Sequence, residues 1–142
     1  MNSTNRVIAV FVAFFIMGII RQFVGVAVFP EQYKEQKSLK SMCEEIDAKC
    51  PMTVDKNTRV DSCTFINKKH LQFTYTLLNT IFDDIDHEEF ELSTKKNLVK
   101  SFKTGKQQEF FRRNRITIEF VYADKDGITI ANIVLEPEDY AY

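Results

Sequence analysis

Few residues of the sequence could carry out chemistry, and they are scattered. The chain has 142 residues, with two histidines, three cysteines and no tryptophan. A serine, threonine or cysteine nucleophile needs a neighbouring base. We expect His70 in a turn and His87 at the start of a helix, where neither is well placed as such a base. The sequence therefore predicts no catalytic residue and no enzyme.

The residues around His87 form an acidic cluster that could bind a divalent cation. Its carboxylates are Asp83, Asp84, Asp86, Glu88 and Glu89. Adjacent residues on a helix point in different directions, and the helix dipole itself favours carboxylates at an N-terminus. A second stretch, Asp124-Lys-Asp126-Gly127, begins like a calcium loop but lacks the later ligands. We therefore predict no metal site and no cofactor.

The cysteines are Cys43, Cys50 and Cys63, an odd number that cannot be fully paired within one chain. Cys43 and Cys50 are seven residues apart, which is roughly 10 Å along a helix. That separation exceeds the limit of about 7 Å between the Cα atoms of a disulfide. Pairing of Cys63 with either Cys43 or Cys50 stays open, and so does the alternative of buried free thiols.

The densest basic patch consists of Arg112, Arg113 and Arg115. The chain as a whole has 19 basic and 20 acidic residues, so it has no positive field to attract nucleic acid. We interpret the three arginines as a candidate partner surface for an acidic protein or anionic head groups. The alternative is a solvated helix C-terminus, where basic residues are favoured by the helix dipole.

The segment Val7–Phe29 is almost entirely apolar. As a helix it would measure roughly 34 Å, against about 30 Å for the hydrocarbon core of a bilayer. One interpretation is a transmembrane signal anchor. The other is a cleaved signal peptide, with small residues for cleavage at Gly25-Val26-Ala27. Both interpretations make residues 1–30 a membrane anchor or signal segment, and both place a domain of residues 31–142 in the periplasm or the exterior.

Arg21 and Gln22 interrupt this apolar segment. An arginine inside the bilayer costs about 2.5–3.5 kcal/mol on insertion scales, and less when the side chain reaches the interface. Arg21 is therefore either an interfacial residue or a contact for an acidic residue of another membrane protein. We take Arg21 and Gln22 as the candidate contact with a membrane partner.

The elements that must position all these residues follow from periodicity. Apolar residues spaced three and four apart predict helices over Glu31–Cys50, from Asp86 to Gly105, and over Lys106–Arg113. Alternating apolar and polar residues predict strands over Thr58–Asn67, Leu71–Leu78, Arg115–Ala123 and Ile128–Leu135. Asn67–His70 and Asp124–Gly127 are predicted hairpin turns. A bulge near Ala131-Asn132 would reconcile the changing apolar phase of the last strand, and residues 138–142 are expected to be a tail.

The predicted fold class is α+β. An N-terminal transmembrane helix is followed by the order α-β-β-α-α-β-β, with a four-stranded antiparallel sheet and helices on one face.

The polar stretch from Cys50-Pro51 to Ser62 contains Asp55, Thr58-Arg59 and Asp61. We expect Arg59 and Asp61 to pair on one strand face and Asp55 to cap a turn at Asn57 or Thr58. Together with the strand Leu71–Leu78 and the final hairpin, this pattern resembles small bacterial envelope proteins, single-span or lipoprotein, of uncharacterised function. The resemblance implies an envelope location and assigns no activity to any residue.

Our preferred functional hypothesis is a membrane-tethered, extracytoplasmic domain that binds a protein partner, either as a subunit of a membrane complex or as an immunity-type inhibitor. The alternative is a small-ligand or lipid-binding envelope domain. Its cavity would lie between the helices and the aromatic sheet face of Phe73, Tyr75, Phe120 and Tyr122.

Overall fold

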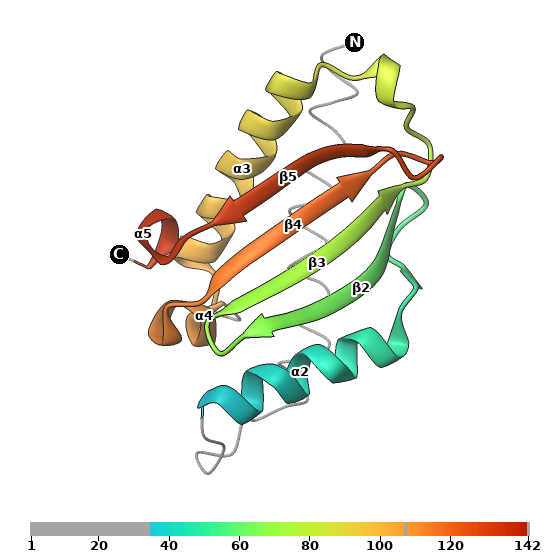
Figure 1. The fold of residues 1–142 in the computed structure, drawn as a ribbon. Coiled ribbons are helices and arrows are strands. Elements are labelled where there is room, and N and C mark those ends of the chain that lie inside the picture. Colours follow the sequence, from blue (N-terminus) through green and yellow to red (C-terminus); the bar gives the residue numbers. More distant parts are fainter. Residues whose placement is uncertain (1–34, 107, 142) are drawn as a thin grey trace.

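A computed structural model describes residues 35–106 and 108–141 of the chain (Figure 1). The elements, with the labels of Figure 1, are α2 (Glu35–Lys49), β1 (Met52–Thr53), β2 (Thr58–Asn67), β3 (His70–Leu77), the 3-10 turn η1 (Phe82–Asp84), α3 (His87–Thr104), α4 (Glu109–Asn114), β4 (Thr117–Ala123), β5 (Thr129–Leu135) and α5 (Pro137–Tyr140). The protein is an α+β fold built on one sheet.

Helix α2 follows the apolar stripe that the sequence predicts. Leu39, Met42, Cys43 and Ile46 are buried, because residues three and four apart share one face of a helix. The helix ends at Lys49. Pro51 causes this end, since a proline disfavours helical geometry in the residue before it. The buried stripe packs on β2, so α2 covers the sheet near that strand.

The sheet has five strands in the order β1-β2-β3-β4-β5, and it is mixed. β3 and β4 run parallel, whereas the other neighbours are antiparallel. The predicted four-stranded antiparallel sheet is therefore wrong in two respects. Met52 and Thr53 pair with β2 as a short fifth strand. Helix α3 carries the chain back along the sheet, so β4 starts at the same end as β3 (Figure 1).

The transmembrane helix of the predicted fold class is not found in the part of the chain that the structure describes. Within residues 35–106 and 108–141, no helix combines the length and the apolar character that a membrane span requires. The segment Val7–Phe29, with Arg21 and Gln22, lies outside the described residues.

Two irregularities in strand pairing decide which side chains face the core. In β2 the register shifts between Val60 and Ser62, which lets both Val60 and Cys63 be buried on the same side. Strict alternation would place them on opposite sides, so the sequence predicts no clean apolar face for β2. In β5 the shift lies between Thr129 and Ala131, one residue before the predicted bulge.

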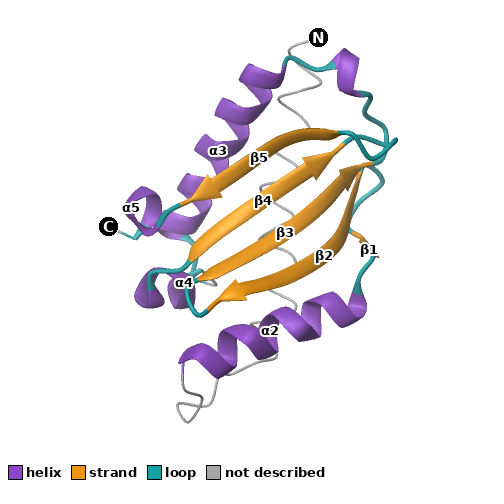
Figure 2. Cartoon of the chain, viewed as in Figure 1, coloured by secondary structure: helices purple, strands orange, loops and turns teal. Residues whose placement is uncertain are grey.

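The core lies on a single face of the sheet. Cys63 of β2 pairs with Phe73 of β3, and Phe73 pairs with Phe120 of β4, so the three side chains point the same way. The sulfur of Cys43 on α2 contacts that of Cys63, and Phe102 of α3 packs edge-on against Phe120. Helices α2 and α3 therefore cover the same face, α2 beside β2 and α3 beside β5 (Figure 2).

Candidate functional site

The sheet face turned away from the core is here called the open face. Strand register places on it Arg59, Ser62, Thr64, His70, Gln72, Thr74, Thr76, Thr117, Glu119, Val121, Asn132 and Val134. Asp61, at the register shift of β2, joins them through its hydrogen bonds with Arg59 and Thr76. The contacts of α2 and α3 with the sheet described above lie on the core face. The side chains of the open face are mostly hydroxyl, amide and carboxylate groups, which suits a polar contact surface.

One end of the open face is an ordered cluster around Asp61. Arg59 donates from Nε to Asp61 Oδ1 at 2.6 Å and from Nη2 to Thr76 Oγ1 at 3.3 Å. Thr76 donates to the second carboxylate oxygen of Asp61 at 2.5 Å. The expected Arg59–Asp61 pair is confirmed. The expected turn cap is confirmed as well, because Asn57 N donates to Asp55 Oδ1 at 2.7 Å.

The middle of the open face carries a second set of polar contacts. The hydroxyls of Ser62 and Thr74 lie 2.5 Å apart. His70 Nε2 is 3.3 Å from Glu119 Oε2, and Glu119 accepts a hydrogen bond from Asn132 at 2.6 Å. His70 is thus next to a carboxylate, and no hydrogen bond joins it to a hydroxyl nucleophile in the described part of the chain. The arrangement orders a surface, and it does not assemble a catalytic group.

His87, at the start of α3, has a structural role. Its Nε2 lies 2.9 Å from the carbonyl oxygen of Phe82, and its Nδ1 lies 3.3 Å from that of Ile130. The ring therefore joins the first turn of α3 to β5. Asp86 Oδ1 accepts from Glu89 N at 3.0 Å and so caps the N-terminus of α3.

The acidic cluster of the sequence forms no metal centre among residues 35–106 and 108–141. Part of it lines a depression of about 400 Å³ that is open to solvent on the outer side of α3. The lining residues are Asp86, Glu88, Glu89, Leu92, Ser93 and Lys96. The carboxylates are placed by the helix N-terminus, as the dipole favours.

The three arginines of the predicted partner surface point to different places. Arg112 Nη1 donates to the carbonyl oxygens of Phe102 at 2.6 Å and of Gly105 at 2.7 Å, which closes the end of α3. Arg115 donates from Nη2 to Glu138 Oε1 at 2.7 Å. The Arg113 side chain is 77% exposed and lies 3.9 Å from Glu109. Arg113 is the most exposed of the three, and Arg115 is 46% exposed beside Glu138. A contact between these arginines and a partner stays a prediction.

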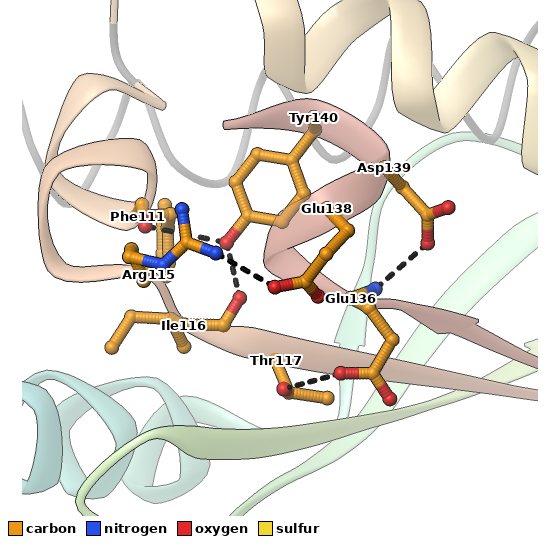
Figure 3. Close-up of polar contacts among 8 residues, drawn as sticks. All are labelled: Phe111, Arg115, Ile116, Thr117, Glu136, Glu138, Asp139 and Tyr140. Carbon is orange, nitrogen blue, oxygen red and sulfur yellow. Dashed lines mark hydrogen bonds and ion pairs between the residues drawn. The ribbon is translucent and has the colours of Figure 1, made fainter. Parts of the chain in front are cut away.

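The C-terminal residues form a clasp that the sequence did not predict (Figure 3). The hydroxyl of Tyr140 donates to the carbonyl oxygens of Ile116 and Phe111, and its ring is fully buried. Glu136 Oε2 accepts from Thr117 at 2.9 Å, while Glu136 N donates to Asp139 at 2.9 Å. The tail expected at residues 138–142 is therefore wrong for residues 138–140, which belong to α5. Pro137 at the first helical position, with Asp139 three residues after Glu136, was the local signal.

The thiols are poorly suited to nucleophilic chemistry. Burial, with the charge of Asp47 as a lesser cause, raises the pKa of the Cys50 thiol to about 11. The hydrogen bond with Cys43 and burial raise the pKa of Cys63 still further above its ordinary value. A reactive cysteine needs a stabilised thiolate, and neither environment provides one.

The aromatic face that could have held a ligand is filled. Phe73, Tyr75, Phe120 and Tyr122 are each at most 3% exposed. Phe90 packs edge-on against Tyr122, and Phe102 against Phe120. Side chains of α3 thus occupy the volume that a small molecule would need.

Comparison with known structures identifies the fold. A candidate secreted protein of Pseudomonas aeruginosa superposes with a TM-score of 0.59 at 10% identity, over 73% of this chain and 90% of that one. The type II secretion system pilotin AspS of Vibrio cholerae gives 0.53 at 12% identity, over 74% and 94%. The type 2 secretion system pilotin EpsS of Vibrio vulnificus gives 0.53 at 8% identity, over the same shares. At these identities the likeness is one of fold.

Sequence comparison places the chain in a family. Residues 33–130 match the family described as Domain of unknown function (DUF8479), and the chain belongs to that family. No curated protein matches the chain.

Proposed function

We propose that this member of the DUF8479 family is an extracytoplasmic accessory domain that binds a protein partner in an envelope assembly. The observation that carries the proposal is the fold, which this chain shares with two pilotins of type II secretion systems over 74% of its length. The third neighbour is a candidate secreted protein. All three neighbours belong outside the cytoplasm or to an export system by their names, which favours the same setting here.

Two features of the chain agree with this proposal. The apolar sequence of Val7–Phe29 is typical of an export segment. The open face presents an ordered array of polar side chains, with Arg59, Asp61 and Thr76 held by one another. A surface whose side chains are already fixed loses less conformational freedom on binding.

Between the two forms of partner binding, the neighbours favour a subunit of a membrane-associated complex over an immunity-type inhibitor, because pilotins are named as parts of a secretion system. The alternative of a small-ligand or lipid-binding domain has no comparable support. Its expected cavity is occupied by Phe90 and Phe102.

The proposal is tested by affinity capture of the full-length chain, tagged at its C-terminus, from detergent extracts of its own host. We expect one envelope protein to co-purify in a fixed ratio and to cross-link to the domain. N-terminal sequencing of the captured chain then establishes whether the apolar segment has been removed. Recovery of the chain alone, before and after cross-linking, would refute the proposal.

Surface variants locate the contact. Val121→Arg changes the open face, Arg113→Glu changes α4, and Lys125→Glu changes the exposed hairpin turn as a matched charge control. A partner on the open face is lost only with Val121→Arg. A partner on α4 is lost only with Arg113→Glu.

A further inference from the structure

Two buried cysteines meet where α2 packs on the sheet. Cys43 lies on the apolar stripe of α2, and Cys63 lies on the core face of β2. Their sulfur atoms are 2.6 Å apart, and the residues are 2% and 4% exposed. The third cysteine, Cys50, follows the end of α2 and donates instead to the carbonyl oxygen of Ile46 at 3.2 Å.

The separation of 2.6 Å is far shorter than the long, weak contact that two thiols make, and it approaches the length of about 2.05 Å of a disulfide bond. The backbones of α2 and β2 therefore already hold the two side chains at bridging distance. We propose that Cys43 and Cys63 form a disulfide bond that fastens α2 to the sheet, and that Cys50 stays a free thiol.

Such a bond would strengthen the attachment of α2 to the sheet. α2 makes most of its contacts with β2, and the strand that follows α2, β1, has only two residues. The bond would close the loop from residue 43 to residue 63, which restricts the unfolded chain and so stabilises the folded one. It would also fix the orientation of the first described helix on the edge of the domain.

The chemistry requires an external disulfide as oxidant, of the class of oxidised glutathione or a protein disulfide oxidoreductase. When local opening exposes the pair to water, the thiolate of one cysteine attacks a sulfur of that disulfide, forming a mixed disulfide and releasing one thiol. The thiolate of the second cysteine then attacks the protein-side sulfur and releases the other thiol. Two electrons pass from the cysteine pair to the oxidant, and the two cysteine protons end on the released thiols.

This inference rests on the contact between α2 and β2 and goes beyond the proposed partner binding, so it is tested separately. The full-length chain, purified in detergent under reducing conditions, is incubated with oxidised glutathione, with and without mild urea that lets buried thiols open. Free thiols are then alkylated in denaturant, and digested peptides are analysed by mass spectrometry.

We expect one alkylated residue, Cys50, and a linked peptide pair containing Cys43 and Cys63. The linked protein is lighter by two hydrogen atoms than its reduced form, and its Tm is roughly 10–20 °C higher. Cys50→Ser keeps the linkage. Cys63→Ser abolishes it, since Cys43 and Cys50 are too far apart to pair. Three alkylated cysteines under both conditions, or a bridge that includes Cys50, would overturn the inference.

Thiol trapping in intact host cells reports on the compartment instead. A chain that forms the Cys43–Cys63 bond with glutathione and is reduced in cells would contradict the extracytoplasmic location of the proposed function, and it would leave the disulfide assignment supported.

Discussion

The carboxylate of Asp124 accepts a hydrogen bond from the backbone N–H of Phe82 at 2.9 Å, across 42 positions of sequence. It also accepts from Asp126 N and Ile128 N, both at 2.9 Å. One buried side chain thus holds the β4–β5 hairpin and the connection between β3 and α3 together. That connection determines where α3 starts, and α3 leads the chain from β3 to the parallel strand β4. Asp124 therefore supports the arrangement that makes these two strands parallel.

Replacing Asp124 by Asn should lower the Tm at neutral pH. Burial by itself raises the pKa of the Asp124 carboxyl, but the backbone N–H groups of Ile128, Phe82 and Asp126 outweigh it and lower the pKa below its ordinary value. A lowered pKa means that the stabilisation is complete above about pH 4 and is lost as the pH falls through the folded-state pKa. The difference in Tm between wild type and variant should therefore shrink below about pH 4.

The control for Asp124 is Asp126→Asn, which makes the same charge change in the same turn but at an exposed side chain. Thermal melts from pH 2 to pH 8 compare the two variants. Equal Tm losses at both positions would contradict the special role of Asp124.

Tyr140→Phe should destabilise the domain by about 1–3 kcal/mol, because it leaves buried carbonyl oxygens of Ile116 and Phe111 without a donor. Tyr122→Phe is the matched control. The Tyr122 hydroxyl is buried without a hydrogen-bond partner among the described residues, so its removal should leave stability unchanged or improve it. Urea denaturation measures both, and an equal cost for the two would argue against the clasp.

Phe102→Ala should cost about 3–5 kcal/mol. The Phe102 ring packs against Phe111, Phe120 and Tyr140 and is fully buried, so its loss opens a cavity between α3, the sheet and the clasp. Ile128→Ala, at a side chain that is 51% exposed, should change stability by less than about 0.5 kcal/mol. A cost for Phe102→Ala below about 1 kcal/mol, measured in urea, would mean that these elements pack loosely.

Arg113→Glu should leave the Tm nearly unchanged, because its ion pair with Glu109 is exposed and long. If α4 contacts an acidic partner, this variant should slow association several-fold, and the difference should disappear at high salt. Surface plasmon resonance with the captured partner provides the measurement. Unchanged association at low salt would remove Arg113 from the contact.

Arg112→Gln completes that comparison. Arg112 closes α3 through the carbonyl oxygens of Phe102 and Gly105, so its loss should lower the Tm, whatever the partner. If Arg112→Gln weakens partner binding and also lowers the Tm, the lost binding is explained by the damaged fold. Weaker binding by Arg113→Glu at an unchanged Tm would instead show that the α4 surface contacts the partner.

The local elements were predictable because their signals are local. The stripe of α2, the alternation of His70–Leu77 and the Asp-Gly turn, whose Gly127 has φ of +85°, all follow from neighbours in sequence. The Arg59–Asp61 pair followed from a spacing of two on one strand. The bulge between Val60 and Ser62 was not predicted, since an extra residue in a strand shifts the alternation of side chains without a turn residue to mark it.

The candidate surface was less predictable than the elements. Arg112, Arg113 and Arg115 are near one another in sequence, and that proximity suggested one patch. Helix α4 ends at Asn114, and Arg115 has φ of +51°, so the side chains diverge to separate partners. The open face was not singled out, because its residues come from strands whose order was not yet known.

The sequence alone determined the class of the domain, most of its helices and strands and both hairpins, because periodicity and turn chemistry act over a few residues. Tertiary structure decided how the two hairpins join. Their parallel contact between β3 and β4 depends on where α3 packs, and a two-residue strand such as β1 exists only when β2 is beside it. It also decided that Tyr140 belongs to the core and that Cys43 meets Cys63, since both contacts join elements far apart in the chain.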